Sequence, residues 1–284
     1  MTYRTILAVI RDMDMDEPVI AAAMRLARLG DDAEPGEGRL VRACAVLTEP
    51  MMPVLSPNEI PVQEWRDRVG HLLGQADMIA GQAGKALGER GVDHEERPLV
   101  LPAGMIADEV ARLARHADIC IMPWPTSVAR RRDAAEAFDG ALFSTGRPVL
   151  IVPPGPLSKS WGETVMVAWD EQPQAVRALA DALPLLRAAT DVHVVIVQND
   201  RDTSRPPTID LKPMLARHGI TAKFEIVERR GRGIGEALRE QAEWLEADMV
   251  VMGGYGHSRF REIVLGGATH DMLGHNGIPI LLSH

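Results

Sequence analysis

The sequence predicts an α/β protein made of two similar domains, each built around a parallel β-sheet. Short runs rich in Val and Ile recur along the chain without polar alternation, which suits strands covered on both faces. Segments with helical spacing of apolar residues lie between these runs, and strand alternating with helix is typical of parallel sheets. The second half of the chain also repeats the first, and 284 residues are enough for two domains.

The predicted strands and helices alternate in both halves of the chain. The strands are Thr5–Ile10, Leu40–Leu47, Asp118–Met122, Pro148–Val152, Val165–Trp169, Val192–Val197, Phe224–Val227, Met249–Met252 and Ile278–Leu282. The helices are Pro18–Leu29, Val62–Arg90, Ile106–Arg115, Gln174–Ala189 and Ile234–Leu245.

Three pairs of segments carry the internal repeat, and the first matches ILAVI at Ile6–Ile10 with VMVAW at Val165–Trp169. The sequence DICIM at Asp118–Met122 matches DMVVM at Asp248–Met252, and GRPVLI, which begins at Gly146, matches GIPILL, which begins at Gly277. Between the copies, the sequence PPGPLSKS has the Pro and Gly content of a linker. We therefore place the boundary near Pro156, with one domain over residues 1–156 and the other over residues 157–284.

The composition indicates a globular protein of the cytoplasm. Hydrophobic residues make up 46% of the chain and charged residues 25%. No apolar run approaches the ~18–20 residues that a membrane span needs, and the N-terminus lacks the pattern of a signal peptide. The net charge of −9 argues against a nucleic-acid partner. Cys44 and Cys120 lie inside apolar runs, where we expect buried, reduced thiols.

A glycine-rich segment near the C-terminus is the strongest sign of a binding site. It leaves the predicted strand Met249–Met252 with Gly253 and Gly256 and ends with Gly266 and Gly267 ahead of a helix-like stretch. Glycine lets the backbone come close to a ligand, and amides at a helix N-terminus bind phosphate well. Asp170 ends the first strand of the same half and is a candidate acceptor for ribose hydroxyls or a contact for Mg²⁺.

These residues resemble a known family. The spacing Gly253-x2-Gly256-x9-Gly266-Gly267 resembles the nucleotide loop of the ATP-binding universal stress proteins, and Val165–Asp170 resembles their opening strand with its terminal Asp. The two copies resemble the tandem members of the family over nearly the whole chain. The resemblance implies two Rossmann-like (adenine nucleotide alpha hydrolase-like) domains. Each would be a five-stranded parallel sheet of order 3-2-1-4-5 flanked by helices.

The resemblance also implies that the C-terminal domain binds ATP or another adenine nucleotide and has a regulatory or stress-response role. The residues expected to hold the nucleotide are Asp170, Gly253, Gly256, His257, Gly266, Gly267, Ala268 and Thr269. Gly267 stands where the family has Ser or Thr, and Thr269 is close enough to offer a substitute hydroxyl. Family members pair through their last strands, which implies a pseudo-dimer of the two domains and leaves a homodimer open.

Two other functions remain open beside nucleotide binding. No catalytic base or nucleophile pair is evident, which favours binding over turnover, but Asp170 could position Mg²⁺ and water for slow ATP hydrolysis or adenylyl transfer. The second alternative is a scaffold whose pocket is vestigial in both halves.

The first half has lost the nucleotide pattern. Pro123-Trp-Pro-Thr126 replaces the glycine turn, and Glu136 and Ala137 stand where the later glycines would be. Proline lacks an N–H, and larger residues block close approach of the backbone. Arg11 falls at the position of the strand-ending Asp, with Asp12 one residue late. We expect this half to bind no nucleotide in the same way.

Three further features receive a structural interpretation. The glycines of Gly231–Gly235 predict a turn and a helix start, because a dinucleotide loop would need glycine at Glu236. The histidines at 257, 270 and 275 lack the spacing of a metal site. Trp169 is expected to be a buried strand residue, although its position beside Asp170 leaves contact with adenine open.

Overall fold

A computed structural model describes residues 2–29, 38–49, 62–124, 128–158, 160–198, 210–254, 267–275 and 277–284, without the side chains of residues 128–132, 270 and 275. The chain divides into two compact units. The N-terminal unit contains Tyr3–Arg147, and the C-terminal unit contains Leu157–His284 together with Pro148–Pro153. Among the described residues, no helix combines the length and apolarity that a membrane span requires.

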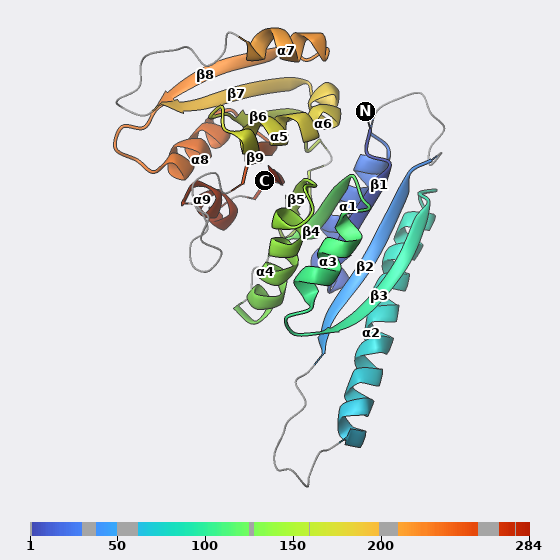
Figure 1. Cartoon of the computed structure of the whole chain (residues 1–284). Helices are drawn as coiled ribbons and strands as arrows, with labels where there is room; N and C mark the ends of the chain where they lie inside the picture. The colour runs from blue at the N-terminus through green and yellow to red at the C-terminus, as the bar shows by residue number, and fades with distance from the viewer. Residues whose placement is uncertain are drawn as a thin grey trace. The chain divides into compact units, whose positions relative to one another are not determined.

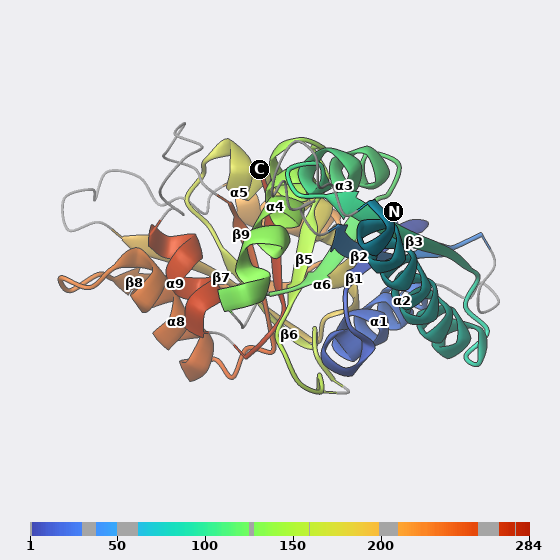
Figure 2. The ribbon, with the colours of Figure 1, turned by 90° about the horizontal axis from the view of Figure 1, so that it is seen from below.

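The N-terminal unit is a parallel sheet with helices on both faces (Figure 1). Its elements are β1 (Thr5–Ile10), α1 (Met13–Ala27), β2 (Leu40–Glu49), α2 (Val62–Gly88), β3 (His94–Pro102), α3 (Ile106–Ala114), β4 (Ile119–Pro123) and α4 (Val128–Phe143). The strands lie in the order β3-β2-β1-β4, all parallel. Helices α1 and α2 lie on one side of these strands, and α3 lies on the other side with α4 beside it (Figure 2).

The C-terminal unit repeats this arrangement. Its elements are β5 (Val149–Val152), β6 (Thr164–Ala168), α5 (Pro173–Asp181), α6 (Leu183–Ala188), β7 (Asp191–Gln198), α7 (Leu211–Arg217), β8 (Ala222–Glu228), α8 (Ile234–Trp244), β9 (Met249–Gly253), α9 (Gly267–His275) and β10 (Ile280–Ser283). The parallel order β8-β7-β6-β9-β10 confirms the predicted order 3-2-1-4-5. Strand β5, from the first copy, pairs antiparallel with β10, so that Ile151 lies opposite Ile280.

Two differences from the predicted elements have local causes. Strand β3 was missed because its sequence, HEERPLVLP, is charged and contains Pro98, which an edge strand tolerates. The predicted helix Gln174–Ala189 is divided into α5 and α6, because Pro184 lacks the N–H that a continuous helix would need. The interpretation of Gly231–Gly235 is confirmed, since Gly231 has a φ of 78° in the turn and α8 begins at Ile234.

The repeated aspartate ahead of the fourth strand of each copy joins that strand to the first. The carboxylate of Asp118 accepts hydrogen bonds from the backbone N–H groups of Arg4 and Thr5, at 2.8 and 3.0 Å. The carboxylate of Asp248 likewise accepts from the N–H groups that lead into β6 (Gly162, Glu163 and Thr164). The repeat therefore marks a shared anchor at the amino edge of each sheet.

The central strands form the core of each unit, and most of their side chains are fully buried. Cys44 on β2 and Cys120 on β4 are free thiols with no exposed surface, which confirms that both are buried and unpaired. Burial raises the pKa of the Cys44 thiol to about 12, and it also raises the pKa of the Cys120 thiol.

Candidate functional site

The carboxyl ends of β6 and β9 meet at one edge of the C-terminal sheet. These strands are parallel neighbours, with Val165 paired to Met249 and Ala168 paired to Met252. The sheet order reverses between them, and ligands of open α/β sheets bind at the carboxyl ends beside such a reversal. The structure thus brings Asp170 and Gly253 to adjacent strand ends, as the sequence predicted.

Asp170 lies in a tight turn that fixes its carboxylate at this edge. One oxygen, Oδ1, accepts a hydrogen bond of 3.0 Å from the backbone N–H of Gln172, and the residue is exposed. Glu171 has a φ of 61°, a left-handed conformation that is uncommon for a residue with a side chain. Since α5 begins at Pro173, the turn is held between the end of β6 and the start of a helix. The other oxygen, Oδ2, receives no hydrogen bond from the described part of the chain, so it can accept one from a ligand.

Gly253 permits close packing between β9 and the N-terminus of α5. A Cβ atom at this position would lie 2.7 Å from the backbone N of Ala175 and 2.8 Å from the carbonyl carbon of Gln174. No side chain fits there unless the backbone moves. The sequence predicted that Gly253 allows a ligand to approach the backbone. The structure shows that the absence of a side chain at Gly253 also allows α5 to pack closely against β9.

The start of α9 contains the other predicted positions that the structure describes. Gly267 is the first residue of α9 and is exposed, and no atom of the described residues lies within 4 Å of the place that a Cβ would occupy. Ala268 is packed against Gly235 of α8, whose Cβ would lie 2.9 Å from the Ala268 Cα. Thr269 is 3% exposed. The N-terminal amides of α9 belong to a helix of 9 residues, and such amides favour anions.

Three predicted site residues, Gly256, His257 and Gly266, lie outside the described residues. Their part in the site stays a prediction.

The structure adds Trp169 to the residues of interest at this edge. Its indole Nε1 is buried and has no acceptor among the residues described, although burying an unpaired N–H costs free energy. Trp169 lies just past the end of β6, directly before Asp170, and is only half-buried, so the expectation of a buried strand residue is not confirmed. In the sequence, its position beside Asp170 was the only indication that Trp169 could contribute to this site.

The C-terminal residue also helps to hold this edge together, which the sequence did not suggest. The ring Nδ1 of His284 lies 3.1 Å from the carbonyl oxygen of Gly254, just past β9. Arg177 on α5 donates a hydrogen bond of 2.5 Å to the His284 backbone oxygen. The ends of β9 and β10 are thereby joined to α5.

The corresponding edge of the N-terminal sheet has a different chemistry. Strand β1 pairs Ile6 with Ile119, and counting along the two copies from these pairs puts Arg11 at the position of Asp170. The Arg11 guanidinium forms an ion pair of 2.9 Å with Asp133 of α4. Asp133 also accepts a hydrogen bond from the hydroxyl of Thr48 at the end of β2.

The replacements for the glycine turn in this copy also make structural contacts. Trp124 packs edge-on against Phe138 of α4, with ring centroids 6.0 Å apart and an interplanar angle of 87°. The Glu136 carboxylate accepts a hydrogen bond of 3.1 Å from the backbone N–H of Gly104. At positions where the sequence predicts ligand contacts in the second copy, the first copy therefore has residues that hold α4 in place.

Comparison with known proteins gives one family match and similar solved structures. The model of the Universal stress protein family matches residues 163–284. Comparison with curated protein sequences finds no match. The chain is similar in structure to a universal stress protein from Archaeoglobus fulgidus DSM 4304, with a TM-score of 0.74 and 17% identity over 98% of this chain and 95% of that one. It is also similar to a functionally unknown protein from Pseudomonas aeruginosa PAO1, with a TM-score of 0.59 and 14% identity over 99% of this chain and 92% of that one.

Proposed function

Because residues 163–284 form a domain of the universal stress protein family, we propose that this domain binds ATP, ADP or AMP and gives the protein a nucleotide-dependent regulatory role in a stress response. The proposal rests chiefly on Asp170. This exposed carboxylate is held at the end of β6, next to the end of β9, where the strand order reverses. A carboxylate in that place suits the two hydroxyl groups of a ribose.

The described residues are compatible with a nucleotide. The amides at the start of α9 can donate to phosphate. Among the described residues, no atom comes within 4 Å of a Cβ placed on Gly267 at this helix start. Carboxylate oxygens are also ligands that Mg²⁺ accepts, so a metal–nucleotide complex is compatible with Asp170. The phosphate groups of the nucleotide would carry the negative charge that the N-terminus of α9 attracts.

The pairing of β5 with β10 supports the second part of the proposal, an intramolecular pseudo-dimer. Each is the last strand of its copy, and three residues of each are paired in antiparallel register. Strand edges joined in this way are no longer open to another chain. On this proposal, the first copy acts as the built-in partner of the nucleotide-binding copy.

The test begins with protein purified without added nucleotide and then denatured, so that any released small molecule can be identified by mass spectrometry. Calorimetric titration with ATP, ADP and AMP follows. We expect Asp170→Ala to lower the affinity about tenfold, because charge-assisted hydrogen bonds to the ligand are lost. The matched control is Asp12→Ala, since Asp12 makes the same turn with the N–H of Asp14 at 3.0 Å in the copy that is expected not to bind.

Equal affinities of the parent and Asp170→Ala would remove Asp170 from the site. If no adenine nucleotide binds to the parent, the proposal fails and the scaffold interpretation takes its place. Product formation from ATP, measured in the same samples, separates binding from slow hydrolysis.

A second variant restores the hydroxyl that the family has at position 267. Gly267→Ser has space for its side chain, and a hydroxyl in the first turn of α9 can donate to phosphate. We expect about a threefold higher affinity for ATP, as an added neutral hydrogen bond would give. A lower affinity would place the phosphates elsewhere.

A further inference from the structure

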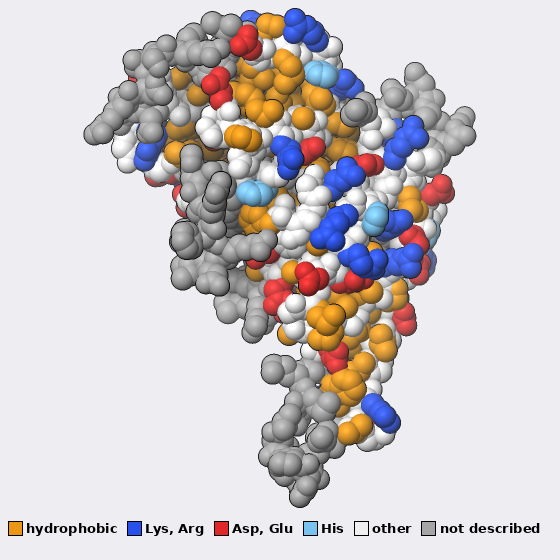
Figure 3. Space-filling view, viewed as in Figure 1, with side chains coloured by type: hydrophobic (Ala, Val, Ile, Leu, Met, Phe, Trp, Pro, Cys, Tyr) orange, Lys and Arg blue, Asp and Glu red, His pale blue; other side chains and the backbone are white. Residues whose placement is uncertain are grey.

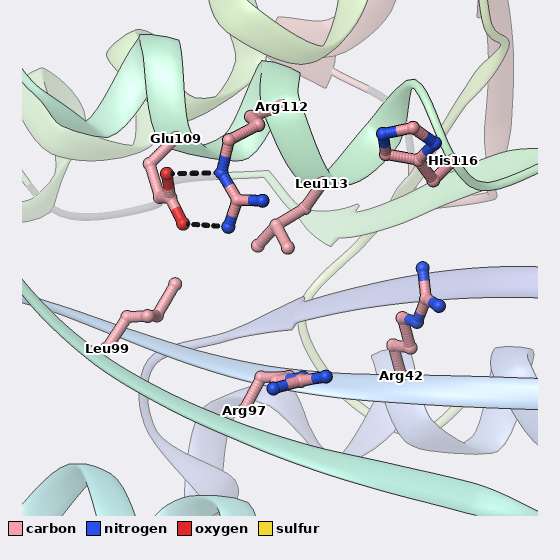
Figure 4. Close-up of a pocket in the computed structure, with 7 residues that line it drawn as sticks. All are labelled: Arg42, Arg97, Leu99, Glu109, Arg112, Leu113 and His116. Atoms are coloured by element: carbon pink, nitrogen blue, oxygen red, sulfur yellow. Dashed lines mark hydrogen bonds and ion pairs between the residues drawn. The ribbon is translucent and has the colours of Figure 1, made fainter.

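A pocket of about 400 Å³ lies in the N-terminal unit between α3 and the strands β2 and β3 (Figure 4). We call it the arginine pocket; it is lined by Arg42, Arg97, Leu99, Glu109, Arg112, Leu113 and His116. Its volume falls within the range of roughly 300–1,000 Å³ that is usual for small-molecule sites. None of its residues belongs to the nucleotide site proposed above.

Strand register and helix periodicity bring these side chains together. Arg42 is paired with Glu95 across β2 and β3, and the next pair on the same face contains Arg97. Glu109, Arg112 and His116 follow one another at three and four residues, so they lie on one side of α3 and its end. Figure 4 shows the Arg112 guanidinium directed toward the strands and the Arg42 guanidinium directed toward the helix.

The pocket has more positive than negative groups. Glu95 accepts a hydrogen bond of 2.9 Å from Arg42 and also pairs with Arg97. Glu109 accepts two hydrogen bonds from Arg112, at 2.8 and 2.6 Å, and these bonds lower the pKa of its carboxyl. Three guanidinium groups thus face two carboxylates. This excess stands out in a chain with a net charge of −9, and Figure 3 shows Lys and Arg side chains gathered over α3, β2 and β3.

The arginines keep donors for a ligand. A guanidinium carries five N–H groups, and the bonds to Glu95 and Glu109 use only part of each set. We propose that the arginine pocket binds a small phosphorylated molecule, with its phosphate between Arg42, Arg97 and Arg112 and its organic part against Leu99 and Leu113. Planar guanidinium groups match phosphate in geometry as well as in charge, and apolar walls with a few convergent polar groups are typical of ligand sites.

A purely structural role makes a different prediction. Charged residues directed inward on an edge strand protect the sheet from pairing with another chain, and cations near the end of α3 suit its dipole. These roles explain each cation separately, but they do not require an open pocket between the cations. If they were the whole explanation, loss of an arginine would leave phosphate binding unchanged.

The experiment is a calorimetric titration of the full chain with inorganic pyrophosphate at constant ionic strength, because added salt screens charges at the surface. We expect Arg97→Gln and Arg112→Gln each to lower the affinity about tenfold, the loss typical of a charge-assisted bond. The matched control is Arg68→Gln, an exposed arginine of α2 that is not among the lining residues and should have no effect.

Glu109→Gln tests the pocket in the opposite direction. Without the carboxylate, Arg112 is released and a repelling charge is lost, so pyrophosphate should bind several-fold more tightly. A gain of affinity cannot come from damage to the fold. Far-UV circular dichroism and thermal unfolding of each variant check the fold directly.

Several results would overturn the proposal. These are no pyrophosphate binding to the parent, equal binding to the parent and to the Arg97→Gln/Arg112→Gln double variant, or weaker binding to Glu109→Gln. Succinate binding as tight as pyrophosphate would overturn the assignment to phosphate. The pyrophosphate titrations compare the parent with variants of the arginine pocket, whereas the nucleotide titrations compare the parent with Asp170→Ala, so failure here and failure of the nucleotide proposal are distinguishable.

Discussion

The carboxyl edges of the two sheets share a backbone plan and differ in what their side chains do there. In the C-terminal unit, an exposed Asp170 follows the end of β6, and among the described residues its Oδ1 accepts only from a local backbone N–H. In the N-terminal unit, the corresponding Arg11 is turned to Asp133, with side chains 16% and 21% exposed. One edge keeps a polar group available to a ligand, whereas the other satisfies its charges internally.

Two copies of one fold can therefore keep the same backbone plan while their carboxyl edges differ in chemistry. The backbone plan depends on groups that both copies retain, such as the aspartate ahead of the fourth strand, which accepts backbone N–H groups at the amino edge. The carboxyl edge is free to vary because no ladder of the sheet depends on its loops. In the first copy, the ion pair of Arg11 and the ring contact of Trp124 with Phe138 connect that edge to α4. We infer that these contacts stabilise the N-terminal unit in place of a ligand.

The largest expected effect follows from Gly253. Gly253→Ala places a methyl group 2.7 Å from a backbone nitrogen of α5, so either the helix or the strand must move. We expect the free energy of unfolding of the C-terminal unit to fall by about 2–3 kcal/mol, as for other overpacked positions. Urea unfolding followed by circular dichroism measures it. Gly267→Ala is the control, because its methyl group meets nothing within 4 Å. Equal losses in the two variants would contradict the packing argument.

The next effect concerns the ion pair of the first copy. Asp133→Ala removes the carboxylate that pairs with Arg11 and accepts from Thr48, so we expect a loss of about 1–3 kcal/mol in the N-terminal unit. A double-mutant cycle with Arg11→Met measures the coupling between the two side chains. Asp191→Ala is the control, since its pair with Lys223 is exposed and surface pairs contribute about 0–1 kcal/mol. A coupling near zero would mean that the ion pair does not replace a ligand.

The last effect on stability is absent at neutral pH and appears only at alkaline pH. It comes from the thiols, which only the N-terminal unit contains. The pKa of Cys44 is raised from 9.0 to about 12 by burial. Below pH 9 the thiol is neutral in both the folded and the unfolded states, so it does not affect stability. Above pH 9 the thiol ionises first in the unfolded chain, and stability falls until the folded thiol ionises near pH 12.

Unfolding by urea between pH 8 and pH 10.5 tests this sign, with Cys44→Ala as the control. The parent should lose up to about 1.4 kcal/mol per pH unit more than the variant over the alkaline part of the range. Identical slopes would show that the Cys44 thiol ionises equally easily in both states.

Much of the fold was predictable because the signals were local. Buried parallel strands such as β4 and β9 are continuous apolar runs, and the repeat of Asp118 and Asp248 reflects one anchor used twice. Strand β3 could not be predicted in this way. Its charged face and Pro98 suit an edge, and a position at the edge is a property of the whole sheet.

Part of the candidate site could also be predicted from local signals. Asp170 and Gly253 come at the ends of apolar runs in the sequence, and both lie at adjacent strand ends in the structure. The tight approach of Gly253 to α5 and the contact of His284 with Gly254 join parts of the chain that are distant in sequence. No local pattern reports such contacts.

Apolar periodicity, glycine and proline act on the nearest residues of the chain, so the class of fold, the two copies and the contrast between their carboxyl edges follow from the sequence. The contacts of the exceptional residues follow from packing. Arg42 lies in a predicted strand and Arg97 in β3, which the sequence did not predict, and strand register and the crossing of α3 bring them together with Arg112 around one pocket. Arg11 likewise appears only as a missing aspartate until α4 places Asp133 beside it. Whether a charged side chain is paired or remains available to a ligand depends on which residues lie next to it in space. Packing determines those neighbours.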